Sequence, residues 1–543
     1  MSPELARRLC ELSRACNRQL GVIVDRLGVV DKVIIGDAHQ LFIPDLGRER
    51  AGGGRFRGVR LVHTHLRNES ISRDDLTDLA LLRFDTIVML QAQPDGLPGP
   101  VEYAHLLPPT ARNEDGSAAM WRVEKIPSVH GWEDDFSTFI RDLQAQFKDG
   151  AGPRRVEGVE QAVLISVTTR DPKGARRSLE ELERLSETAG LHVVDRQLQV
   201  RRELDGRTLV GQGKLKELVV RCMHLGAEVL IFDQELSPSQ LRNIATETDL
   251  KVLDRTQLIL DIFSQRATTR EGILQVELAQ LRYRKPRLAI MPTAMSRLTG
   301  GIGGRGPGET KLEINRRRAD ERQTLIERQL KDISAQRKMR RDRRKRVGLP
   351  LVAVVGYTNA GKSTLLNRMT NSAVDAEDKL FATLDPTSRR LRFPEMREII
   401  LTDTVGFIKN LPKDLIHAFR STLDEALDAD LLLHVVNAGD ADPTAQKDAV
   451  EKVLHELDAG DTPTLMVLNQ IDRADADTVA ALTLSWDATP VSARTGDGLP
   501  ALLDRIERTL FRERAAAKWA RSQEEGTAEA EDPAPLATGA TGS

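Results

Sequence analysis

Leu351-Val352-Ala353-Val354-Val355-Gly356-Tyr357-Thr358-Asn359-Ala360-Gly361-Lys362-Ser363-Thr364 is the most informative stretch of this 543-residue chain. Its apolar run predicts a buried strand, its two glycines bound a tight loop, and a helix is expected to begin at Lys362. The loop matches G-x-x-x-x-G-K-[ST], a pattern typical of loops that bind nucleotide phosphates. Glycine lets backbone N–H groups face an anion, and the helix N-terminus adds further donors. We expect Lys362 to reach the β- and γ-phosphates and Ser363 to bind Mg²⁺.

The residues around this loop, from 349 to 512, are predicted to form one nucleotide-binding domain. Asp403-Thr404-Val405-Gly406 ends a strand, where the carboxylate can hold Mg²⁺ through water and the glycine N–H can meet the γ-phosphate. In Asn469-Gln470-Ile471-Asp472, the last carboxylate can accept from the N1–H and 2-amino groups of guanine, which adenine lacks. Further strands and a closing helix are expected at 390–393, 398–402, 431–436, 464–468 and 499–510.

Composition and charge are ordinary for a soluble protein, with a formal net charge of −2. No run is long and apolar enough to span a membrane, and the first residues lack a signal-peptide pattern. The three cysteines, Cys10, Cys16 and Cys222, are too few and too scattered for a disulfide framework or a zinc ribbon. We expect a cytoplasmic protein of about three to four domains.

Residues 1–155 are predicted to form a separate N-terminal unit. Strands are expected at 22–24, 32–35, 60–62 and 86–90, and a helix at 75–82. Proline and glycine are frequent between residues 100 and 160, which favours loop and linker interrupted by one helix at 136–147.

The same unit contains a candidate zinc site, formed by His63, His65 and Asp75. Two His and one Asp can bind Zn²⁺ and leave a position open for water. The pattern H-x-H, a short loop and S-x-x-D resembles the metal site of JAB/MPN metalloprotease-like domains and RadC-like proteins. It departs from them at Leu66, where proline is usual, and in the preceding strand, which offers Gln19 and Asp25 rather than a glutamate base. Histidines at i and i+2 of a strand are more often plain surface or core residues, so zinc binding is a hypothesis, and metallopeptidase-like activity is the weakest option.

Residues 160–256 alternate strands with helices, which predicts a parallel sheet. Ser237 and Pro238 are expected at the start of the last helix of this unit.

Residues 257–347 are predicted to be mostly helical and to pack as an antiparallel hairpin. A sparse apolar stripe on the second arm is expected at Leu312, Leu325, Leu330 and Ile333. The connecting segment 300–308 is too rich in glycine for a helix. The run 337–346 is almost wholly basic and lacks matching acids, which indicates contact with a polyanion. The tail, residues 513–543, is rich in Ala, Glu, Gly and Pro, and disorder is expected there.

Several motifs between about 160 and 512 resemble those of the HflX family of ribosome-associated GTPases, within the translational GTPase superclass. They are Phe232-Asp233-Gln234-Glu235-Leu236-Ser237-Pro238-Ser239-Gln240, Asp254-Arg255-Thr256, Gln275-Val276-Glu277-Leu278-Ala279-Gln280-Leu281, Arg305-Gly306-Pro307-Gly308-Glu309 and Phe381-Ala382-Thr383-Leu384-Asp385-Pro386. The resemblance implies a multidomain α/β protein, in which a parallel α/β domain and a helical hairpin precede a P-loop GTPase domain with a mostly parallel sheet flanked by helices. It also implies hydrolysis of GTP with Mg²⁺, binding to the large ribosomal subunit and its RNA, and action in splitting or rescuing stalled ribosomes or in ribosome biogenesis. A monomer is expected.

The resemblance further assigns roles to residues of the nucleotide site. Ser363 and Thr383 would bind Mg²⁺, and Lys362, Thr383 and Gly406 would serve catalysis. Gly356 and the loop that follows it would hold the phosphates. The other expected nucleotide contacts are Tyr357, Thr358, Asn359, Ala360, Gly361, Thr364, Phe381, Ala382, Leu384, Asp385, Asp403, Thr404, Val405, Asn469, Gln470, Ile471, Asp472, Ser492, Ala493 and Arg494.

Two positions depart from the family pattern. Gln470 stands where a lysine usually packs over the base and braces the phosphate loop, so weaker guanine affinity is expected, while Asp472 keeps the preference for GTP over ATP. Phe407 stands where many relatives have a glutamine that orients water. Because a phenyl ring cannot polarise water, we expect slow intrinsic hydrolysis that a partner accelerates.

Two other functions use the same residues. An ATPase or small-molecule kinase would have the same phosphate loop, but Asn469 and Asp472 and the lack of a lid-like substrate region argue against it. An RNA-binding protein with a weak nucleotide site would bind RNA in a salt-sensitive way that does not depend on nucleotide.

Overall fold

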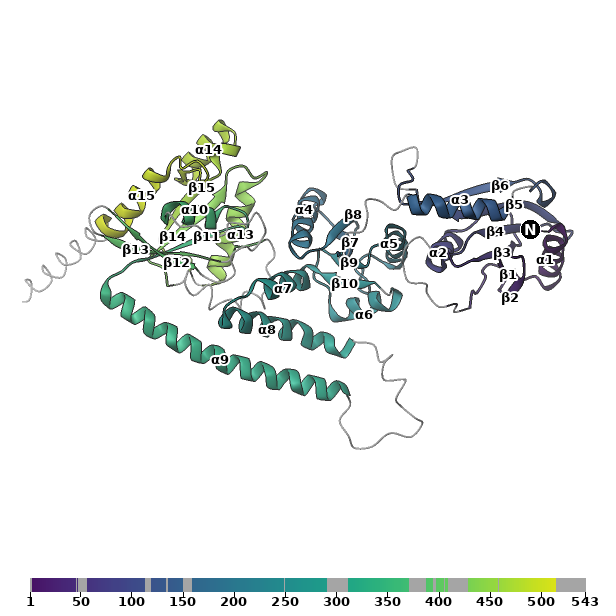
Figure 1. The fold of residues 1–543 in the computed structure, drawn as a ribbon, viewed down its shortest axis with the longest axis horizontal. Coiled ribbons are helices and arrows are strands. Elements are labelled where there is room, and N and C mark those ends of the chain that lie inside the picture. Colours follow the sequence, from purple (N-terminus) through teal and green to yellow (C-terminus); the bar gives the residue numbers. More distant parts are fainter. Residues whose placement is uncertain are drawn as a thin grey trace, which may run out of the picture. The chain divides into compact units, whose positions relative to one another are not determined.

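The computed structural model describes residues 2–44, 46, 56–112, 119–132, 135–149, 159–248, 250–290, 311–370, 387–393, 397–404, 406–408, 428–457 and 459–513. The chain divides into two compact units, Met1–Leu258 and Ile259–Ser543, and the described residues form three β-sheets (Figure 1). No helix in this described part is long and apolar enough to cross a membrane. The expected contacts at 381–385, which include Thr383, and at Val405 lie outside the described residues, as do the segment 300–308 and the tail after 513.

The N-terminal domain is a six-stranded mixed sheet in the order β2-β1-β3-β4-β5-β6, in which β3 and β4 run parallel and the other pairs run antiparallel. Its core is split by the sheet: α1 packs on one face, and α2 and α3 pack on the other. Its elements are α1 (Pro3–Cys16), β1 (Leu20–Asp25), β2 (Val30–Ile35), β3 (Val59–His65), α2 (Arg73–Leu82), β4 (Ile87–Ala92), β5 (Pro98–Leu106), β6 (Trp121–Ile126), the short η1 (Val129–Gly131) and α3 (Phe136–Asp149).

The interpretation of residues 100–160 as loop and linker is wrong for its first part, because β5 and β6 complete the sheet there. Pro98 and Pro100 favour a loop when the sequence is considered alone. In the structure they open β5 next to a register shift in β4, a place where the missing proline N–H is tolerated. The helix expected at 136–147 is confirmed as α3.

The second domain is a parallel four-stranded sheet in the order β10-β9-β7-β8, as the alternating pattern predicts. Ser237 caps α6 through Gln240 in a reciprocal capping box with Pro238 in the first turn, which confirms the expected start of this helix. The elements are β7 (Gln161–Thr168), α4 (Pro172–Thr188), β8 (His192–Val200), α5 (Gln212–Leu225), β9 (Val229–Phe232), α6 (Pro238–Glu247) and β10 (Lys251–Asp254).

The predicted helical hairpin is confirmed, and its two arms lie side by side in Figure 1. Ion pairs link Glu271 to Arg337 (2.8 Å) and Arg282 to Glu327 (2.9 Å), so the arms run antiparallel. Arg337 therefore has a matching acid, contrary to the sequence-based expectation for the basic run. The helices of this part are α7 (Arg255–Arg266), α8 (Arg270–Arg284), η2 (Lys285–Ile290) and α9 (Lys311–Val347).

Among the described side chains, the apolar stripe of α9 differs from the expected one at Leu325. Ile326 is fully buried against α8, with Leu330 and Ile333 beside it, whereas Leu325 is 46% exposed. The spacing of 326, 330 and 333 follows one helix face, and residue 325 lies about 100° away from that face. The side chain of Leu312 lies outside the described residues.

The C-terminal domain is a six-stranded sheet in the order β12-β13-β11-β14-β15-β16, parallel except for the edge strand β12. The order reverses at β11, and a ligand crevice forms at the carboxyl ends of strands at such a point. The loop after β11 lies there. The elements are β11 (Leu351–Gly356), α10 (Lys362–Thr370), β12 (Thr387–Arg392), β13 (Glu398–Asp403), β14 (Leu431–Asn437), α13 (Pro443–Glu456), β15 (Thr464–Asn469), η4 (Ile471–Arg473), α14 (Ala476–Trp486), β16 (Thr489–Pro490), α15 (Leu499–Glu507) and η5 (Arg508–Glu513).

Candidate nucleotide-binding site

The loop after β11 requires glycine at both ends. Gly356 has a φ of 155°, and a Cβ there would lie 2.3 Å from the carbonyl oxygen of Val435 on the next strand. Gly361 has a φ of 83°, and a Cβ there would lie 2.4 Å from the Asn469 amide nitrogen. These close approaches bring the loop against β14 and against the end of β15, so side chains at either glycine would push the loop out of place.

Lys362, Ser363 and Asp403 converge at the start of α10. The Lys362 ammonium is buried and donates to the carbonyl oxygen of Tyr357 at 2.8 Å. Burial lowers the pKa of Lys362 to about 8, and the nearby Asp403 carboxylate opposes that shift. The Ser363 hydroxyl donates to the Asp403 carboxylate at 2.5 Å. Two oxygen ligands of the kind that Mg²⁺ prefers, the Ser363 hydroxyl and the Asp403 carboxylate, therefore lie next to each other.

Gly406 and Phe407 lie against the phosphate loop. The Thr358 N–H donates to the Phe407 carbonyl at 2.7 Å, and the Phe407 N–H donates to the Gly356 carbonyl at 3.1 Å. A Cβ at Gly406 would come within 2.8 Å of the Thr358 side chain and 3.0 Å of the Lys362 ammonium. Phe407 is 1% exposed, so its ring packs in the interior and is not aimed at solvent.

Asn469 joins three segments of the site. Its side-chain amide donates to the carbonyl oxygen of Ala360 at 2.8 Å, and its side-chain oxygen accepts from the N–H of Ala493 at 3.0 Å. Asn469 itself is buried. One side chain thus holds the phosphate loop, the end of β15 and the segment after β16 in a fixed relation.

Asp472 lies three residues after Asn469, and its side chain is held as a carboxylate. Ser492 donates to one of its oxygens at 2.7 Å, and the Arg494 guanidinium lies 2.7 Å from the other. The Ser492 hydrogen bond lowers the pKa of Asp472, and the charge of Arg494 lowers it further. The group is therefore ionised at neutral pH and acts only as an acceptor.

Gln470 braces the phosphate loop, a role that the sequence-based expectation for this position missed. Its side-chain amide donates to the carbonyl oxygen of Asn359 at 3.1 Å. Both residues adopt left-handed backbone conformations, with φ of 63° at each. An amide can donate to a carbonyl as an ammonium does, so the contact survives without the lysine charge.

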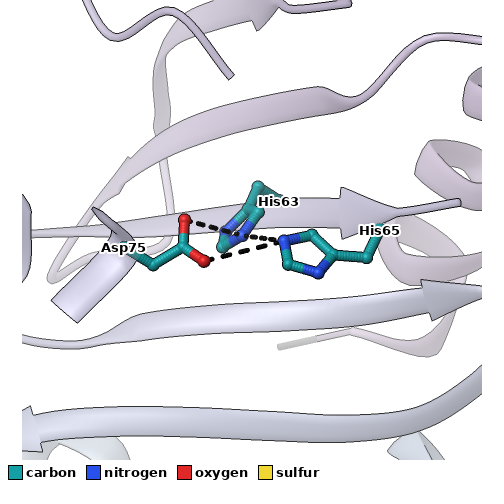
Figure 2. Close-up of side chains that lie close together, drawn as sticks. All are labelled: His63, His65 and Asp75. Atoms are coloured by element: carbon teal, nitrogen blue, oxygen red, sulfur yellow. Dashed lines mark hydrogen bonds and ion pairs between the residues drawn. The ribbon is translucent and has the colours of Figure 1, made fainter. Parts of the chain in front are cut away.

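A second cluster, separate from this site, lies in the N-terminal domain. The Nε2 atoms of His63 and His65 are 3.1 Å apart, and the carboxylate of Asp75 lies 3.4 Å from the first and 3.7 Å from the second (Figure 2). The structure thus brings together the three residues that the sequence singles out as candidate ligands.

Three family models match consecutive parts of the chain. They describe a GTP-binding GTPase N-terminal region (residues 176–264), a GTP-binding GTPase middle region (266–344) and a 50S ribosome-binding GTPase (351–470). GTPase HflX of Lacrimispora saccharolytica is 48% identical over 351 residues, which are 65% of this chain and 83% of that protein. The chain belongs to the HflX family of GTPases.

Other relatives agree with this assignment. HflX of Caldanaerobacter subterraneus is 47% identical over 65% of this chain and 81% of that protein, and HflX of Escherichia coli K12 is 44% identical over 66% and 84%. Among solved structures, a GTP-binding protein from Sulfolobus solfataricus in complex with GDP is 23% identical, covering 65% of this chain and 99% of that one. Its TM-score to this chain is 0.35. Family membership confirms the expected α/β fold class and GTPase activity.

Proposed function

We propose that this HflX GTPase is a nucleotide-driven switch that binds GTP with Mg²⁺, engages the large ribosomal subunit and splits or rescues stalled ribosomes in the cytoplasm. The observation that carries the proposal is the double contact of Asn469 with Ala360 and Ala493. It holds the phosphate loop against the segment after β16, where Ser492 orients the Asp472 carboxylate, so that one ligand can reach both the loop and the carboxylate.

In this proposal each described residue of the site has a defined task. Backbone N–H groups from Gly361 to Thr364, at the start of α10, hold the phosphates together with Lys362. Ser363 binds Mg²⁺ with Thr383, and Asp403 supports the ion. The Gly406 N–H meets the γ-phosphate. Asp472 accepts from guanine, Ser492 and Arg494 keep that carboxylate in place, and Ala493 holds Asn469.

The surroundings of Phe407 support the expectation of slow intrinsic hydrolysis. Its ring is buried and carries no polar atom, so this position supplies nothing to orient the attacking water. A partner that completes the site can accelerate such a reaction by about 10³- to 10⁵-fold. The ribosome is the proposed partner, since the matching family model describes a 50S ribosome-binding GTPase.

The helical hairpin is the proposed contact with ribosomal RNA. Exposed Arg316 and Arg318 add to the positive charge of α9, and the basic run 337–346 continues it. Basic side chains on one long helix provide phosphate contacts without sequence readout. Co-sedimentation with purified large subunits tests the switch: binding with a non-hydrolysable GTP analogue should exceed binding with GDP. Equal binding in both states would favour the alternative, an RNA-binding protein with a weak nucleotide site.

Nucleotide affinity is expected to fall at alkaline pH. Lys362 has a pKa of about 8 without nucleotide, and phosphates would raise that pKa because they favour the charged form. Binding above pH 8 therefore requires proton uptake, whereas the charged form already dominates below pH 7. The GDP dissociation constant should stay flat from pH 6 to 7.5 and then rise by up to about tenfold per pH unit. Calorimetry in two buffers of different ionisation enthalpy measures the uptake directly, and no uptake at pH 8.5 would contradict this assignment.

A further inference from the structure

We propose that His63, His65 and Asp75 bind one divalent cation of the zinc class, which fastens α2 to β3 in the N-terminal domain. This site is independent of the GTPase function. Figure 2 shows both imidazole rings and the carboxylate pointing toward one another, with the histidines coming from β3 and the aspartate from α2. The three ligand atoms all lie within 4.8 Å of one another.

The separations fit a tetrahedral zinc ion. With Zn–N and Zn–O bonds of about 2.0–2.1 Å, two tetrahedral ligand atoms are about 3.3 Å apart. The two Nε2 atoms are 3.1 Å apart. One oxygen of Asp75 lies 3.4 Å from His63 Nε2 and the other lies 3.7 Å from His65 Nε2, so an ion between the two rings is within reach of the carboxylate. Two imidazole nitrogens with one carboxylate favour Zn²⁺ and its transition-metal neighbours over Mg²⁺ or Ca²⁺, which prefer oxygen ligands.

Hydrogen bonding alone explains the triangle less well. If both Nε2 atoms carry protons, two N–H groups face each other at 3.1 Å. If only one Nε2 atom carries a proton, that single N–H is the only donor for both the other imidazole and the Asp75 carboxylate. His63 and His65 are also buried, so water cannot satisfy them freely. A cation at the centre satisfies all three groups at once.

The surrounding contacts orient the Asp75 carboxylate and hold the strand residue between the two histidines. The Ser72 hydroxyl and N–H both donate to Asp75, at 2.7 and 2.8 Å, and this capping box fixes the carboxylate at the first turn of α2. Thr64, between the two histidines, is tied to Ser13 at 2.8 Å and accepts from the Leu20 N–H at 3.0 Å. Partners of this kind set ligand geometry and raise metal affinity.

The strand positions next to the histidines provide no carboxylate base. His63 pairs with Gly21 on β1 and with Met89 on β4, and His65 pairs with Gln91 on β4. Gln19 occupies the next same-face position along the chain from Gly21 and is also buried. The nearby strand positions offer the amides of Gln19 and Gln91 in place of a carboxylate, and the proposed role of the ion is to hold α2 on β3.

The test measures metal in the full-length protein. The chain is stripped with a chelator, placed in excess Mg²⁺ to occupy the GTPase domain, and titrated with Zn²⁺ alone. About one equivalent should bind, and Co²⁺ should give the visible absorption of a low-coordinate site. The double variant His63→Asn, His65→Asn should bind more than about 100-fold more weakly. His130→Asn, which changes an exposed histidine in η1, is the matched control and should bind as the unaltered chain does.

A second measurement uses only the unaltered chain, so it does not depend on the folding of a variant. Adding Zn²⁺ to stripped protein should slow amide hydrogen exchange in residues 63–82 and leave exchange in the GTPase domain unchanged. Failure to bind Zn²⁺, equal binding by the double variant, or unchanged exchange in residues 63–82 would overturn the proposal.

Discussion

Replacing Asp472 with asparagine is expected to change the base preference of the nucleotide site. GTP affinity should fall by about 5- to 150-fold, the equivalent of about 1–3 kcal/mol for one bidentate base contact. In the proposed contact the carboxylate accepts two hydrogen bonds from guanine, whereas an asparagine amide would turn a donor toward the donors of the base. Xanthine has a carbonyl oxygen in place of the 2-amino group, so the variant should bind XTP more tightly than the unaltered protein does.

The matched control is Asp477→Asn. Asp477 is an exposed acid in the first turn of α14, close in sequence to Asp472. Its substitution removes the same charge without touching the proposed base contact, and the preference for GTP should remain. Competition of labelled GDP by GTP, XTP and ATP measures all three affinities. If Asp472→Asn keeps the full preference for GTP over XTP, the guanine contact is placed wrongly.

Replacing Gly406 with alanine is expected to lower GTP hydrolysis by about 10²- to 10³-fold, the usual cost of losing one donor aimed at developing charge. The added Cβ would meet the Thr358 Cα at 3.0 Å and its side chain at 2.8 Å, so backbone must move. That movement takes the Gly406 N–H away from the position proposed for the γ-phosphate. GDP has no γ-phosphate, so its affinity should change by no more than about threefold.

Gly439→Ala is the control for this substitution, because its Cβ would find nothing closer than 3.4 Å. It lies in the same domain and should leave hydrolysis unchanged. Single-turnover hydrolysis and GDP titration on both variants separate the two effects. A Gly406→Ala variant that loses GDP and GTP affinity equally would show a disrupted loop and not a lost γ-phosphate contact.

The convergence of residues around the phosphate loop can be predicted from the sequence, because it depends on local motifs. Gly356 and Gly361 stand where the backbone has no room for a side chain, and the pairing of strands at a topological switch point brings Asp403 and Asn469 to the same edge. Because the strands run parallel, the motifs that follow successive strands all lie at the carboxyl edge of the sheet.

Other features depend on contacts that no local pattern contains. Ile326 is buried and Leu325 is exposed because of the face that α9 turns toward α8. A sparse apolar pattern in the sequence does not show which of two neighbouring residues lies on that face. The brace from Gln470 to Asn359 depends on a loop in left-handed conformation more than 100 residues earlier in the chain. Pro98 and Pro100 favour a loop in the sequence, but the residues form strand β5 because β4 and β6 pair with it on either side.

The cluster of His63, His65 and Asp75 also depends on a contact that no local pattern contains. His63 and His65 are close by sequence, but the approach of Asp75 requires α2 to fold back onto β3. A short-range motif suggests such a site, and only the packed structure shows separations that suit a metal ion.

The rate of GTP hydrolysis with and without purified large ribosomal subunits tests the central claim most directly. The buried Phe407 leaves the attacking water without an orienting group from that position, so the isolated protein should hydrolyse GTP slowly. Saturating large subunits should raise the rate by about 10³- to 10⁵-fold, the range known for completion of a GTPase site by a partner. Small subunits serve as the control and should have little effect. A rate that large subunits leave unchanged would contradict the account.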